Sequence, residues 1–227
     1  GPFGASLFFL FFLSNPLLSI KSSSSFVSVG LSSGENITDG NNNVLLGYRA
    51  GYTANFNNSI GIGYRALYNN TADSNIAIGY DAGFALTSGA SNTAIGFQSA
   101  VTQTTGANNT SVGYATMGGL AGGTALTGSD NTVMGYSAGY AMSGASSSNT
   151  LVGSNAGQSI TAGSDNVLLG HNAMYQADGN AAATSNMVVI GSGACSGAWE
   201  NYTSSNQVVI GKDAMNGALN GTASNVV

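Results

Sequence analysis

The sequence repeats one ten-residue pattern along almost its whole length. Three of the copies read "NNVLLGYRAG" (42–51), "SNIAIGYDAG" (74–83) and "DNTVMGYSAG" (130–139). Each copy has a central glycine, which we number position 0. These glycines recur every 16 to 22 residues, at Gly30, Gly47, Gly63, Gly79, Gly96, Gly113, Gly135, Gly153, Gly170, Gly191 and Gly211. Self-similarity of this period is typical of a solenoid, in which each repeat packs only on its neighbours.

Positions −3 to −1 predict one short strand in every repeat. Position −3 is always β-branched and position −1 is always aliphatic or methionine, which is the period-two pattern of a strand. Glycine at position 0 permits a turn with positive φ or a close approach of two backbones. Asparagine at position −4 in seven repeats suits the turn that enters the strand. The chain is therefore predicted to be an all-β solenoid of about eleven coils.

Position −2 is small or apolar in every repeat and is never charged. It points away from positions −1 and −3, and a strand that is apolar on both faces is buried on both faces. We expect positions −1 and −3 to fill the coil, and position −2 to face an axis where identical chains meet. This expected axial column contains Leu45, Ala77, Ala94, Val133, Leu151, Leu168, Val189 and Val209.

The amino-acid composition argues against a nucleic-acid partner and is consistent with a folded domain. Only 6% of the residues are charged and the net charge is −5, so the basic footprint of a nucleic-acid-binding protein is missing. The apolar fraction of 43% is high enough for a packed core. A single cysteine excludes an internal disulfide framework.

The sequence divides into a non-repetitive N-terminal segment and a repeat domain. Residues 1–25 contain the apolar run "LFFLFFL" and are predicted to be a packed or anchoring tail, with a trimmed signal sequence as the alternative. Residues 26–227 carry the repeats. The final "SNVV" (224–227) matches positions −5 to −2 of a further repeat, so the repeat domain is expected to continue beyond residue 227.

Position +1 is aromatic in six consecutive repeats, and stacked coils would place these rings in a ladder. The leading interpretation is that the rings pack on one another and stabilise the rod. The alternative is a ligand-contact strip for sugar rings or a partner protein. The ladder contains Tyr48, Tyr64, Tyr80, Phe97, Tyr114 and Tyr136.

A motif that resembles a catalytic one is explained by the repeat pattern. "GYSAG" (135–139) fits a nucleophile elbow, with Asp165 and His171 downstream, but Ser137 holds a position that is Arg, Asp, Gln or Asn in other repeats. No carboxylate or cysteine lies at ligand spacing from His171. Cys195 is at position +4, which is methionine in three other repeats (Met117, Met174 and Met215), and is predicted to be a buried apolar thiol. No enzyme, metal or cofactor is predicted. Ice binding through threonine arrays is disfavoured, because threonine holds position −3 in only four repeats and is expected to face the interior.

The motif N-T-A-I-G-x-x-A resembles known repeats. "NTAIGFQSA" (92–100) and "NTVMGYSA" (131–138) look like the head repeats of trimeric autotransporter adhesins, and the tyrosine after glycine is similar to repeats of bacteriophage tail fibres. The resemblance covers residues 26–227 and implies a homotrimeric, left-handed parallel β-roll used in surface attachment. The aromatic residue that follows the repeat glycine favours the bacteriophage fibre over the adhesin.

This resemblance predicts the shaft of a virion fibre on the particle surface. Its expected partners are its own copies, other fibre or virion proteins, and a glycan or protein of the host surface. The alternative is the head of a trimeric adhesin on a bacterial cell surface.

Overall fold

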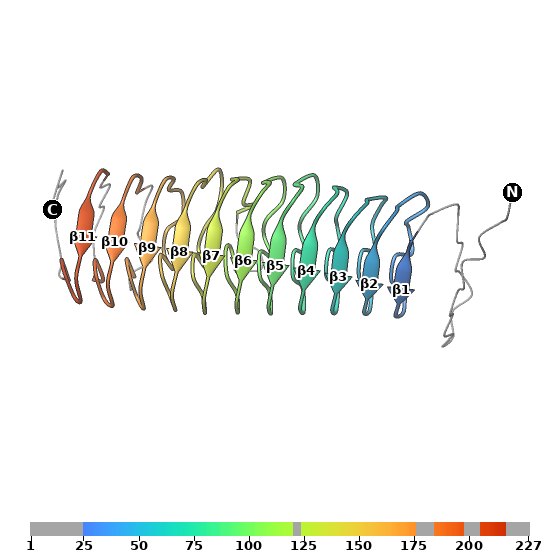
Figure 1. Cartoon of the computed structure of the whole chain (residues 1–227), viewed down its shortest axis with the longest axis horizontal. Helices are drawn as coiled ribbons and strands as arrows, with labels where there is room; N and C mark the ends of the chain where they lie inside the picture. The colour runs from blue at the N-terminus through green and yellow to red at the C-terminus, as the bar shows by residue number, and fades with distance from the viewer. Residues whose placement is uncertain (1–24, 120–123, 176–183, 198–204, 217–227) are drawn as a thin grey trace, which may run out of the picture.

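The computed structural model describes residues 25–119, 124–175, 184–197 and 205–216. These residues form eleven strands of three residues each, joined in one parallel sheet whose order follows the sequence (Figure 1). The strands are β1 (Val27–Val29), β2 (Val44–Leu46), β3 (Ile60–Ile62), β4 (Ile76–Ile78), β5 (Thr93–Ile95), β6 (Thr110–Val112), β7 (Thr132–Met134), β8 (Thr150–Val152), β9 (Val167–Leu169), β10 (Val188–Ile190) and β11 (Val208–Ile210).

Each turn of the solenoid, which we call a rung and number by its strand, repeats the turn before it. Every strand occupies positions −3 to −1, as predicted, and pairs with equivalent positions of the next strand, as in Ala77↔Ala94 and Ala94↔Ser111. The fold is therefore an all-β parallel solenoid of about ten turns, which confirms the predicted class. Left-handed winding and a trimeric state stay predictions.

The rungs turn at fixed repeat positions. Positions −5, +2 and +4 have left-handed backbone in rung after rung, as at Asn108 (φ 58°), Asp81 (φ 53°) and Met117 (φ 50°). Asparagine and aspartate tolerate this conformation best after glycine, which explains their frequency at positions −5 and +2. The strands lie side by side in sequence order along the long axis, with the turns on either side of them (Figure 1).

Glycine at position 0 is required for a second reason. These glycines have φ between 126° and 140°, and consecutive ones lie directly over each other. A Cβ atom on Gly96 would lie 2.1 Å from the carbonyl oxygen of Gly113, which is closer than any real contact. The glycine column thus lets the backbones of adjacent rungs meet without side chains between them.

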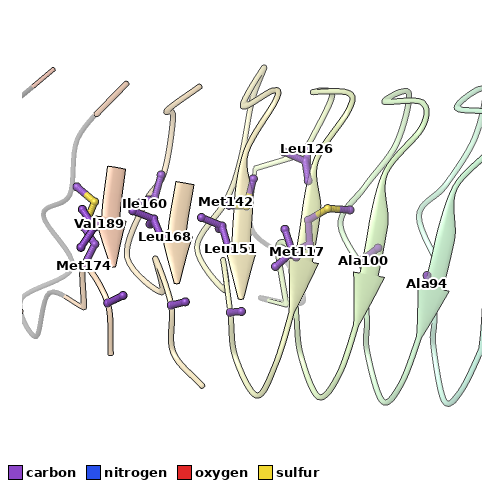
Figure 2. Close-up of a cluster of buried hydrophobic side chains, with 14 of the residues drawn as sticks. Ala94, Ala100, Met117, Leu126, Met142, Leu151, Ile160, Leu168, Met174 and Val189 are labelled. Carbon is purple, nitrogen blue, oxygen red and sulfur yellow. The ribbon is translucent and has the colours of Figure 1, made fainter. Parts of the chain in front are cut away.

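The interior of the rod is filled by positions −2 and +4, together with residues of the returning loops. Figure 2 shows Leu151, Leu168, Met117 and Met174 along this core, with Leu126, Met142 and Ile160 from the loops. The two positions compensate in volume, because Leu45 lies opposite Gly51 whereas Gly61 lies opposite Leu67. A Cβ atom on Gly51 would lie 2.7 Å from a methyl group of Leu45.

This core corrects the expected axial column. Its side chains are buried within their own chain and do not face outward: Leu45, Ala77, Ala94, Val133, Leu151, Leu168, Val189 and Val209 are all between 0% and 4% exposed. Positions −3 and −1 point the opposite way and form what we call the outer sheet face. Val29 and Ile210, at position −1 of the first and last rungs, are 56% and 65% exposed.

A ladder of buried asparagines runs beside the core at position −4. The Oδ1 atom of each accepts from the backbone N–H and the side-chain Nδ2 of the next, as from Asn92 to Asn75 (2.8 and 3.2 Å) and from Asn131 to Asn109 (2.9 Å each). The ladder continues through Asn149 and Asn166 to the N–H of Met187. These side chains therefore tie rungs together, in addition to any part in the turn.

Some predictions fall on residues outside the described ranges. They are the apolar tail, apart from Ser25, and the expected continuation of the repeats at residues 224–227. Within the described ranges, no helix is long and apolar enough to cross a membrane.

Candidate ligand-contact surface

The aromatic residues at position +1 stack as the sequence predicts. The ring centroids of Tyr48, Tyr64 and Tyr80 follow at 5.2 and 4.8 Å, and those of Phe97, Tyr114 and Tyr136 continue at 5.2, 5.0 and 5.2 Å. The planes differ by 8° to 17°. We call this column the first aromatic ladder. Because it follows the turn after each strand, it forms a ridge parallel to the sheet.

Stacking limits what this ladder can bind. Most ring faces are covered by the next ring, so the ladder presents ring edges and phenolic hydroxyls instead. Tyr80 and Tyr114 are 43% and 48% exposed. Sugar rings stack on aromatic faces, which the interior of the ladder does not offer. The geometry favours mutual packing as the role of these rings, and leaves the hydroxyls as the polar groups of the ridge.

A second aromatic ladder lies at position +5 and was not predicted. Tyr52, Tyr68 and Phe84 stack at 5.1 and 5.2 Å. The sequence signal was available, because these three residues occupy one column of three consecutive repeats. The two ladders flank position +2 of the same rungs.

Two arginines at position +2 lie between the ladders. The guanidinium carbon of Arg49 is 5.2 Å from the ring centroids of both Tyr48 and Tyr52. That of Arg65, one rung further, is 5.1 Å from the Tyr64 ring and 4.6 Å from the Phe84 ring. These are cation–π distances. Two of the four Lys and Arg residues in the chain therefore lie at one place on the rod.

The two arginines differ in their partners. Arg65 donates from Nε and Nη2 to the two carboxylate oxygens of Asp81, at 2.8 and 2.6 Å. This hydrogen bonding raises the pKa of Arg65 further above its ordinary value. Arg49 has Arg65 at the equivalent place on the next rung. Its Nε atom is buried without a hydrogen-bond partner, and no carboxylate among the described residues lies within ion-pair distance of its guanidinium.

The motif suggestive of catalysis does not form a site. Ser137 is buried in rung 7, whereas Asp165 and His171 belong to rung 9 and are exposed. Two rungs correspond to about 10 Å along the rod, which is too far for a hydrogen bond between nucleophile and base. Among the described residues, no three His, Cys, Asp or Glu side chains group as metal ligands.

Cys195 lies in the core at position +4, the position of Met117 and Met174, as the sequence predicts. Burial raises the pKa of its thiol to about 12. The thiol is therefore neutral near pH 7 and is a poor nucleophile, so its contribution is to packing.

The outer sheet face runs along all eleven strands of the described rod. In rungs 5 to 8 it carries Thr93, Thr110, Thr132 and Thr150 at position −3, so these threonines face outward, contrary to expectation. The array remains limited to four rungs, and position −3 is valine or isoleucine in all the others.

Searches against protein-family models, curated proteins and solved structures find no match to this chain. The assignment of function therefore depends on the geometry of the rod and on the resemblance of its repeats.

Proposed function

We propose that this chain is the repeat shaft of a trimeric virion fibre of bacteriophage type, which helps to attach the particle to its host. The observation that carries the proposal is the outer sheet face. This face is a row of aliphatic, methionine and threonine side chains along eleven rungs, without one charged residue, and within the described rod none of these side chains is buried.

Three identical rods can cover this face. Every rung has the same strand length and register, so copies aligned side by side would match rung for rung. Rungs about 4.8 Å apart give a face about 50 Å long, and burying it would remove exposed aliphatic side chains such as Val29, Met134 and Ile210 from water. Trimeric closure and left-handed winding belong to the proposal through the resemblance of the repeats.

A shaft needs stiffness, and several kinds of contact between rungs supply it. Backbone hydrogen bonds join the rungs along the described rod, the buried asparagines join rungs 4 to 9, and the two aromatic ladders join rungs 2 to 7 and 2 to 4. None of these elements requires a cofactor or a titrating side chain. A passive structural part on the virion surface is the function that such a rod serves best.

The oligomeric state gives the first test. We expect the native chain to be a trimer by light scattering. Ile95→Asp, on the outer sheet face, should give folded monomers, because three carboxylates brought together in a dry interface cannot all ionise without a large penalty. Ala94→Asp should instead unfold the rung locally, because Ala94 is 4% exposed inside the coil.

Wild-type protein that is monomeric at all accessible concentrations would contradict the proposal, as would a trimer unaffected by Ile95→Asp. Location on a particle is tested separately. Antibodies raised against residues 26–216 should label fibres in electron micrographs of virions produced by the source host, and labelling of cell surfaces alone would assign the chain to an adhesin.

A further inference from the structure

We propose that Arg49, held between Tyr48 and Tyr52, binds the carboxylate of an acidic saccharide. This proposal rests on the proposed function, since it names the class of host-surface ligand that the fibre would contact. It starts from an imbalance of charge. Arg49 and Arg65 lie at the same position of adjacent rungs, but only Arg65 is paired with a carboxylate, that of Asp81 on the following rung.

Arg49 lacks the partner that Arg65 has. The bidentate pair with Asp81 uses both the Nε and Nη2 atoms of Arg65 and leaves that guanidinium satisfied. The guanidinium of Arg49 lies against its two tyrosine rings, and its Nε atom is buried without an acceptor. An added ligand would therefore bind at the Nη1 and Nη2 atoms, which also lack an acceptor among the described residues. A partly buried guanidinium with no acceptor is a place where an added oxyanion gains charge-assisted hydrogen bonds.

The shape and spacing of the guanidinium select a planar oxyanion. Two parallel N–H groups match the two oxygens of a carboxylate, and the flanking rings already fix the guanidinium plane, so little freedom is lost on binding. The ring of Tyr48 opens the first ladder and that of Tyr52 opens the second, so the site lies where both ladders begin.

A saccharide fits the surface around Arg49 better than a peptide does. Extended peptides commonly bind by adding a strand to a free sheet edge, but both edges of β2, β3 and β4 are already paired. The ridge beside Arg49 offers instead the phenolic hydroxyls of Tyr48, Tyr64 and Tyr80, with rings about 5 Å apart. Each hydroxyl both donates and accepts, which suits a hydroxyl-rich polymer lying along the rod.

The test compares two probes on the full chain by isothermal titration: a galacturonate oligosaccharide and its methyl-esterified form, in which each carboxylate charge is replaced by a neutral methyl ester. We expect the acidic form to bind and the ester to bind at least about tenfold more weakly. Arg49→Gln should reduce affinity for the acidic form about tenfold. Arg49→Lys keeps the charge and loses the paired N–H groups, so its affinity for the acidic form should lie between those of the wild type and Arg49→Gln.

Lys212→Gln is the matched control, because it removes the same charge from a side chain that is 81% exposed at the far end of the rod. Binding should be unchanged in it. Four outcomes would each overturn the proposal. They are equal losses of affinity in Lys212→Gln and Arg49→Gln, equal binding of the two probes, no binding of either probe, and tighter binding of an oligoglutamate peptide. Light scattering on the same samples separates this outcome from failure of the fibre assignment, since Arg49→Gln should leave the trimer intact.

Discussion

The glycine at position 0 is the residue on which stacking depends most directly. Its φ near 135° excludes other residues, and its α-hydrogens allow the neighbouring backbone to approach where a side chain would collide. At positions −5, +2 and +4, by contrast, the left-handed backbone holds ordinary residues such as Asn108, Asp81 and Leu67. Those sites cost about 1 kcal/mol for a residue with a Cβ atom.

Two alanine substitutions separate these effects. Gly96→Ala should destabilise the protein by at least about 3 kcal/mol, because it combines an unfavourable φ of 126° with a Cβ atom 2.1 Å from the Gly113 carbonyl oxygen. Gly144→Ala is the control, because Gly144 has φ 58° and no atom within 4 Å of the added Cβ. It should cost only about 1 kcal/mol. Urea unfolding measures both, and equal costs would mean that rungs can separate locally to admit a methyl group.

At the scale of the strand, the sequence located every element but not its orientation. The repeat columns gave all eleven strands at positions −3 to −1. Alternation alone could not decide which face was interior, because both faces are apolar. The deciding signal was a complementarity of volume, in which Leu45 accompanies Gly51 and Gly61 accompanies Leu67. Positions −2 and +4 must face each other for that pattern to make sense.

The candidate site was predictable to a lesser degree. The first ladder followed from stacking, since aromatic residues in one column must lie over each other. The difference between Arg49 and Arg65 could not be predicted, because two arginines 16 residues apart look like ordinary variation at position +2. Only the side-chain conformations show that Arg65 reaches forward to Asp81 while Arg49 stays between its own two tyrosines.

The complementarity in rung 3 can be tested by exchanging its large and small residues. Leu67→Gly should create a cavity and Gly61→Leu should overfill the core, since a Cβ atom on Gly61 already lies 3.0 Å from Leu45. Each single change should cost about 2 kcal/mol or more. The double variant should recover about 1–3 kcal/mol of the sum, measured by urea unfolding. Strict additivity would show that the two positions do not share the core.

At the scale of the whole molecule, cohesion comes from burial and repeated hydrogen bonds, with little from charge. Among the described residues there are two ion pairs, Arg65–Asp81 and Lys212–Asp213, and the second is at 4.0 Å between largely exposed side chains. Exposed pairs contribute at most about 1 kcal/mol. The polar surface consists chiefly of hydroxyls and amides, which salt does not screen.

Thermal stability should therefore be nearly independent of salt. We expect the melting temperature to change by less than about 4 °C between low and molar NaCl, because the ion pairs that salt would screen are worth little. Circular dichroism measures it, with Arg65→Gln as a variant whose remaining salt response should be smaller still. A fall of ten degrees or more would reveal an essential charged contact, within the rod or between its copies.

The register of the rungs has a mechanical consequence. Hydrogen bonds between rungs run along the rod, so tension between its ends passes through every interface in series, and the weakest interface yields first. A rung of 17 residues such as Gly30–Leu46 occupies about 5 Å of the rod but extends to about 60 Å when unwound. Under a sudden pull, such a rod would lengthen by whole turns and dissipate energy while its backbone stays unbroken. Each released rung could rewind on the neighbouring rung that is still folded.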